Sequence, residues 1–260
     1  MKKCSAIKAL LFAMIFGSAV HIDASATSLT PEQILTKELL LNQLMTHIHL
    51  LQLDFKNTGA REKLQERLIE ITAVFDQLPK ESSDTETSEL LSAVQSLWPV
   101  INRHTQWLVS LPEQSAPPEA QSLMRALEKL DRQLLLLRQK TINNDPKASR
   151  QFRFLEQALF MQRITREYLG LLLLRENADN TLSGRMQLQT MATHFDQRLD
   201  IISNELKNNP HANPPLKQSR AAWLYISRSI THFPEQRVPL MVVRYNDRIV
   251  KKLTSVQRML

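Results

Sequence analysis

Residues 61–78 read REKLQERLIEITAVFDQL, with large apolar side chains at intervals of three and four residues. Leu64, Leu68, Ile71, Phe75 and Leu78 fall on one side of a helix with 3.6 residues per turn, which predicts a helix with one buried stripe. No stretch of useful length alternates apolar and polar residues as a strand does.

The composition extends this prediction to the whole chain. Of 260 residues, only 4 are glycine, while 43% are hydrophobic and 23% are charged. The long runs of Leu, Gln, Glu and Arg use side chains that lose little rotamer freedom in a helix, so we expect an all-α protein. The expected helices are 31–57, 60–78, 87–110, 118–141, 148–177, 181–207, 214–231 and 237–258.

Short sequences recur in the same order in the two halves of the chain. The matched segments are 43–46 with 162–165, 75–77 with 195–197, 98–103 with 223–228 and 130–132 with 246–248. They predict two tandem four-helix-bundle-like modules, 27–142 and 147–260. Trp98 and Trp223 are expected at equivalent places, each buried against the second helix of its own module. Chance similarity between helices of like composition is the alternative.

The N-terminus predicts export. Three lysines within the first eight residues precede an apolar run over 9–20, and Ala24-Ser25-Ala26 supplies the small residues of a cleavage site. We expect a signal peptide over 1–26, cleaved after Ala26, and a periplasmic product; an uncleaved membrane anchor is the alternative. Cys4 is the one cysteine. The mature chain would therefore contain no disulfide, thiolate zinc site or catalytic thiol.

Charge is divided unevenly between the halves. Residues 27–146 contain 12 Lys/Arg and 16 Asp/Glu, whereas residues 147–260 contain 18 and 9. An anionic partner would meet the second half first, although a solvated basic surface without a ligand is the alternative. Nucleic acid is not expected as a partner, because the chain has no nucleic-acid-binding motif and is expected to be exported.

Neither an enzyme nor a cofactor is expected. The chain has no G-x-S-x-G, no H-E-x-x-H and no glycine-rich phosphate loop. His47 and His49 are two residues apart on a helix, so they point in different directions and cannot share a metal ion. A b-type haem held by Met and His near helix ends is a minor alternative that no pair of residues singles out.

Residues 153–169 (RFLEQALFMQRITREYL) contain the candidate binding site. Arg163 and Arg166 are three apart, hence on one side of a helix, and Gln162 is adjacent. A guanidinium offers two parallel donors to a carboxylate, nitrate-like or phosphate group, so we expect these three residues to bind a small anion. The alternative is an arginine held by an internal carboxylate.

This segment resembles the first-helix motif of the PilJ/NarX-like sensor domain, found as the N-terminal domain of type IV pili methyl-accepting chemotaxis transducers. The motif runs N-x-A-G-x-Q-R-M-L-S-Q-R-I-A-K-x-Y-L. Gln157, Leu159, residues 162–164, Arg166 and 168–169 match it, whereas its Ala-Gly falls on 154–155 and its first Arg falls on Ala158. The later F-D-x-x-L and W-x-x-I elements are similar to the second and third helices of that family.

The resemblance implies a helical, periplasmic signal-input module, here in a free-standing tandem copy. Such a module would be a non-enzymatic sensor that binds a small, anionic ligand or signal and presents it to a membrane receptor. A periplasmic adaptor that binds another protein and no small molecule is the alternative. A second copy of the chain, as a homodimer, is a further candidate partner.

Overall fold

The computed structural model describes residues 29–113, 115, 119–143, 152–174, 178–233 and 238–259. The expected signal peptide, 1–26, lies outside these residues, as does 144–151, where the expected module boundary falls. The described part is all-helical, with eight helices and no strand. The helices are α1 (Pro31–Leu53), α2 (Thr58–Phe75), α3 (Thr85–Ser110), α4 (Gln121–Asn143), α6 (Arg153–Leu173), α7 (Ala178–Glu205), α8 (Asn213–Thr231) and α9 (Pro239–Met259). No helix in this part of the chain is long and apolar enough to cross a bilayer.

Capping residues determine where the first two helices begin and end. The Thr30 hydroxyl accepts from the Gln33 backbone N–H, and the Gln33 side chain accepts from the Thr30 N–H, so a capping box begins α1. The expectation that α1 runs to residue 57 is wrong. Asn57 instead caps α2 by accepting from the Ala60 N–H at 2.9 Å, and Gly59, which falls in the gap between the expected helices 31–57 and 60–78, lies inside α2.

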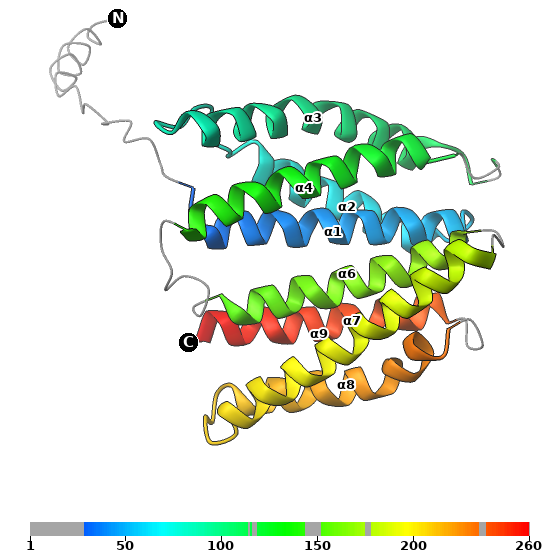
Figure 1. Ribbon diagram of the computed structural model, residues 1–260. Coiled ribbons are helices and arrows are strands. Elements are labelled where there is room, and N and C mark those ends of the chain that lie inside the picture. Colours follow the sequence, from blue (N-terminus) through cyan, green and yellow to red (C-terminus); the bar gives the residue numbers. More distant parts are fainter. Residues whose placement is uncertain are drawn as a thin grey trace, which may run out of the picture.

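Two hydrophobic clusters form the interior. One is built from α1, α2, α3 and α4; the other is built from α6, α7, α8 and α9 together with a few side chains of α1 and α2. Within each set, the first helix contacts the second and fourth, and the third contacts the second and fourth. The two sets meet chiefly where α1 lies along α6, with α3 and α8 at opposite outer edges (Figure 1).

Trp98 and Trp223 are buried, as the sequence predicts. Trp98 packs on Phe75 of α2 with ring centroids 4.6 Å apart, and Trp223 packs on Phe195 of α7 at the same separation. The Trp223 indole N–H also donates to Asp196 at 2.7 Å. Trp98 therefore packs α3 against α2, and Trp223 packs α8 against α7.

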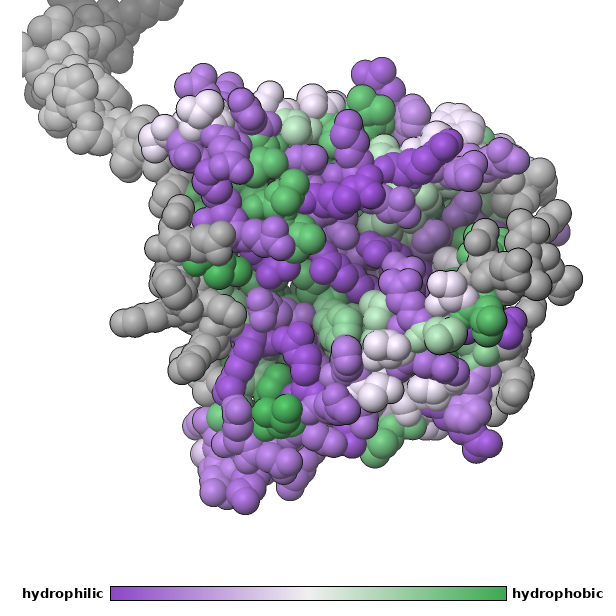
Figure 2. Space-filling view, in the orientation of Figure 1, coloured by the Kyte–Doolittle hydropathy of each residue, from purple (hydrophilic) through white to green (hydrophobic). Residues whose placement is uncertain are grey.

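The first helix of each set is buried on almost every side, because it packs against helices of both sets. Its polar side chains are therefore enclosed with it: on α1 these are Lys37, Glu38, Asn42, Gln43, Thr46 and His47, and on α6 they are Gln157, Gln162 and Thr165. The face of the molecule seen in Figure 2 is mostly hydrophilic, with small hydrophobic patches among the polar side chains. The concentration of buried polar groups between α1 and α6 defines the candidate site.

Candidate functional site

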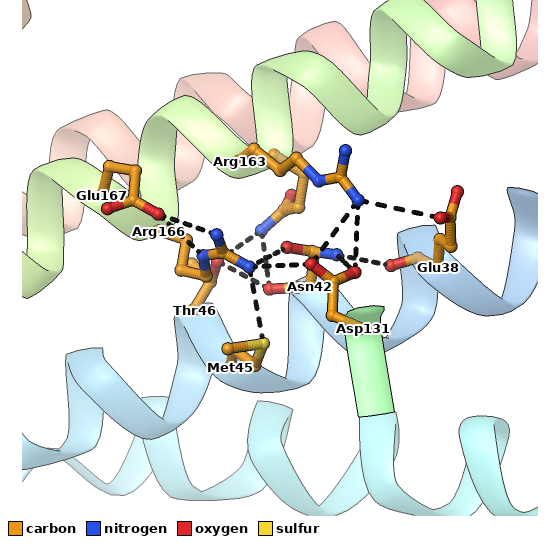
Figure 3. A network of polar contacts seen from close by, with 9 residues as sticks. Glu38, Asn42, Met45, Thr46, Asp131, Arg163, Arg166 and Glu167 are labelled. Carbon is orange, nitrogen blue, oxygen red and sulfur yellow. Dashed lines mark hydrogen bonds and ion pairs between the residues drawn. The ribbon is translucent and has the colours of Figure 1, made fainter. Parts of the chain in front are cut away.

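The three residues expected to bind an anion lie together on α6, where α6 faces α1 and α4 (Figure 3). Their partners are side chains of the chain itself. We call this set the junction network: Glu38, Asn42 and Thr46 of α1, Asp131 and Arg138 of α4, Glu156, Gln162, Arg163, Arg166 and Glu167 of α6, and Asn246 of α9.

Arg166 has a partner for each end of its guanidinium. Nη1 donates to Asn42 Oδ1 at 2.7 Å and to Asp131 Oδ2 at 3.3 Å, while Nη2 donates to Glu167 Oε1 at 2.7 Å. Burial opposes the charged form, but Glu167 and Asp131 outweigh it and raise the pKa of Arg166. Arg166 is therefore charged, and it links α6 to α1 and α4.

Arg163 is held through one nitrogen of its guanidinium, Nη2. Its Nη2 lies 3.3 Å from Asp131 Oδ1 and 3.7 Å from Glu38 Oε1. Its Nη1 and Nε have no acceptor among the described residues, and Figure 3 shows the outer nitrogen directed away from both carboxylates. The side chain is 23% exposed. Arg163 thus keeps two nitrogens without an acceptor in the described part of the chain.

Gln162 is fully buried and connects three helices. Its Nε2 donates to Thr46 Oγ1 on α1 at 2.6 Å, and its Oε1 accepts from Asn246 Nδ2 on α9 at 2.7 Å. Both ends of the amide are therefore used within the protein. Gln162 has a structural position in the network and no face toward solvent.

Glu38 is the buried acid of the network. It is 0% exposed, and its Oε2 lies 2.9 Å from Arg138 Nε. Burial raises the pKa of Glu38 to about 7, against the opposing effects of Arg138 and Arg163. Glu38 therefore changes charge near neutral pH.

The network carries no surplus of positive charge. Its three arginines face four carboxylates, because Arg138 also lies 3.4 Å from Glu156 and Arg166 pairs with Glu167. An anion would therefore have to bind beside carboxylates. Protonation of Glu38 removes one of the four negative charges and makes the site more favourable to an anion.

Histidines and metal ligands are not gathered at this site. Burial lowers the pKa of His47, and burial lowers the pKa of His49 to about 4, so both are neutral at pH 7. No group of three His, Cys, Asp or Glu residues in the described part is placed to hold a metal ion.

Sequence reasoning missed the acceptors. Asp131 lies in the repeated segment 130–132, and Asn42 directly precedes the repeated segment 43–46, but neither position shows that it faces Arg166. The hydrogen bonds that join them span 35 and 124 residues of chain. A pattern within one stretch of sequence cannot predict a contact between residues so far apart in the chain.

Comparisons with protein-family models, with curated proteins and with solved structures find no match to this chain. The similarity to the PilJ/NarX-like sensor domain stays a prediction drawn from residues 153–169.

Proposed function

We propose that this chain is a non-enzymatic, exported sensor-type module that binds a small oxyanion at Arg163 and presents the bound state to a membrane receptor. The observation that supports this most directly is that Nη1 and Nε of Arg163 have no acceptor in the described part of the chain. Each of these two nitrogens can donate a charge-assisted hydrogen bond to an oxyanion.

The proposal includes an architecture of two tandem four-helix-bundle modules, 27–142 and 147–260. The same order of helix contacts within α1–α4 and within α6–α9 supports it. So does the equal 4.6 Å separation of the two Trp–Phe ring pairs, since the sequence places these residues in matched segments. Under this proposal, α1 and α6 are equivalent helices that pack against each other.

Binding at Arg163 would act on the contact between the modules. Arg163 Nη2 shares Asp131 with Arg166, and it lies near Glu38. An anion bonded to Nη1 or Nε of Arg163 weakens the attraction of Arg163 to these carboxylates, so α6 is held less firmly to α1 and α4. A receptor that contacts both modules would detect that change.

The adaptor is the second candidate, and the charge balance of the junction network favours it. If Asp131 and Glu38 satisfy Arg163 completely, the arginines only fasten the modules together. The protein would then act by binding another protein of the periplasm or a second copy of itself.

A thermal-shift screen with nitrate, acetate and phosphate, paired with a pull-down from periplasmic extract, separates the candidates. The sensor proposal expects at least one anion to raise the melting temperature of the wild type and not of Arg163→Ala. Arg198→Ala is the matched control, because Arg198 is 45% exposed and lies 3.8 Å from Glu156 of the same network. No shift with any anion, together with capture of a protein that high salt releases, would favour the adaptor.

Export is proposed from the N-terminal sequence alone. N-terminal sequencing of the periplasmic protein should begin at Thr27-Ser28-Leu29. An intact N-terminus recovered with the inner membrane would contradict cleavage.

A further inference from the structure

A hollow of about 350 Å³ lies between the N-terminal end of α1 and the C-terminal end of α2. Its volume falls within the range of small-molecule sites, roughly 300–1,000 Å³. Leu29, Val74 and Pro79 form its apolar wall, and Lys37 of α1 is the one cation among its described lining residues. We call this space the α1–α2 hollow. None of the residues that line it belongs to the junction network.

Lys37 lines the hollow as a buried cation without a partner. The residue is 5% exposed, yet its ammonium forms no hydrogen bond or ion pair with a described residue. Burial lowers the pKa of Lys37, and no carboxylate in the described part of the chain opposes this shift. A buried ammonium without a counter-charge costs stability, so folding alone does not explain Lys37.

The matched position in the second half carries a charge that is paired. Lys37 and Glu156 each lie six residues before the repeated segments 43–46 and 162–165. The Glu156 carboxylate is 3.4 Å from Arg138 and 3.8 Å from Arg198. The protein therefore neutralises a charge at this place on α6 with its own side chains, whereas on α1 the charge faces the hollow.

We propose that the α1–α2 hollow binds a small monocarboxylate with a short aliphatic tail, with its carboxylate on Lys37 Nζ and its tail on the apolar wall. The carboxylate supplies the counter-charge that Lys37 lacks. A dicarboxylate or a phosphate brings more negative charge than one ammonium neutralises, and Glu32 also lines the hollow. Nitrate and other inorganic anions have no tail to bury against the wall.

Titration of hexanoate into purified Arg163→Ala protein by calorimetry tests the proposal, because this variant lacks the proposed anion site and keeps the hollow. Saturable binding is expected. Affinity should fall about tenfold or more from hexanoate to butyrate, since two methylenes fewer are buried and each contributes about fourfold. Neither 1-hexanol, which lacks the carboxylate, nor nitrate, which lacks the tail, should bind measurably.

Lys37→Met removes the ammonium and keeps an unbranched side chain in its place. Added to Arg163→Ala, it should weaken hexanoate binding at least tenfold. Alone, it should melt no lower than wild type, because the ammonium that it removes is buried without a partner. Lys80→Met is the matched control: Lys80 is exposed and follows Pro79 directly, and its loss should leave the affinity for hexanoate unchanged.

A second measurement uses wild type and does not depend on the folding of any variant. Hexanoate should raise the pKa of Lys37, followed by NMR of the lysine Cε signals, and leave the signal of Lys80 unaffected. Three results would overturn the proposal: no saturable binding of hexanoate, equal affinity for 1-hexanol, or undiminished binding after Lys37→Met. None of them bears on nitrate binding at Arg163, so this site and the proposed sensor function can fail separately.

Discussion

Arg166 of α6 donates to Asp131 of α4 at 3.3 Å, and this ion pair is one of several that join the two helical sets. Asn42 of α1 lies between them and bonds to both, at 2.7 Å from Arg166 and 2.8 Å from Asp131. Because Asp131 also pairs with Arg163, a single carboxylate carries much of the polar contact between α4 and α6.

Asp131→Asn should destabilise the protein by about 3 kcal/mol, because it leaves Arg163 and Arg166 partly buried without their shared carboxylate. Urea unfolding measures the change. Glu86→Gln is the control: Glu86 is 68% exposed and pairs with Lys140, so its loss should cost under about 1 kcal/mol. Equal effects of the two substitutions would show that Asp131 is not central to the junction.

Trp98→Ala and Trp223→Ala should each cost about 3–5 kcal/mol, since each removes a large buried ring that packs on phenylalanine. The third tryptophan provides the comparison. Trp107 is 54% exposed, and Trp107→Ala should cost less than about 1 kcal/mol. Chemical denaturation of the three variants tests the ranking, which a costly Trp107→Ala would contradict.

Glu38 should make stability depend on pH. Its pKa is raised from 4.5 to about 7 in the folded protein, so the folded state holds the proton more tightly and stability falls as pH rises through that window. The free energy of unfolding of Glu38→Gln, relative to that of wild type, should therefore rise by about 3 kcal/mol between pH 4.5 and pH 7.5. The measurement is the free energy of unfolding of both proteins across that range.

The comparison with wild type is needed because the pKa of His49 is shifted in the opposite direction, so His49 changes stability with pH in the opposite sense. Its pKa is lowered to about 4, so its contribution is lost as pH falls from 6.5 toward 4 in both proteins. Glu32→Gln, at an exposed position of the same helix, is the control for the loss of one carboxylate from α1. A constant difference between Glu38→Gln and wild type at all pH values would refute the prediction.

Gly170→Ala should stabilise the protein by about 0.5–1 kcal/mol. Gly170 is within α6, and a Cβ there would lie 3.8 Å from His49 Nε2, an ordinary contact. Gly184→Ala is the contrast, because its Cβ would lie 2.5 Å from Leu171 Cδ2 and Leu171 would have to move. Thermal unfolding should therefore rank Gly170→Ala above Gly184→Ala, and the reverse order would be inconsistent with this packing.

The helices were predictable because their signals are local. Apolar spacing over 61–78 and the prolines near 31 and 239 identify segments that the structure forms as helices. The expected end of α1 at residue 57 is wrong, because α1 ends at Leu53 and Asn57 caps α2. The two buried tryptophans were also predictable, because a large apolar side chain in a matched position has few other places to pack.

The candidate site was predictable only in part. Spacing alone places Arg163 and Arg166 on one side of α6, and the structure brings them together with Gln162. Spacing along α6 does not predict Asp131 or Asn42, because these residues lie on other helices. They determine which nitrogens of each guanidinium already have an acceptor. Nor does spacing distinguish Gln43 from Gln162, whose surroundings differ although their sequences match.

Direct titration of nitrate and acetate into the protein by calorimetry, with Arg163→Ala and Arg166→Ala in parallel, tests the central claim of anion binding at Arg163. The account predicts saturable binding of at least one anion to wild type, tighter near pH 6 than pH 8 because Glu38 is then protonated. It predicts no binding to Arg163→Ala at either pH. Binding that survives in Arg163→Ala, or heat signals indistinguishable from dilution in wild type at both pH values, would contradict it.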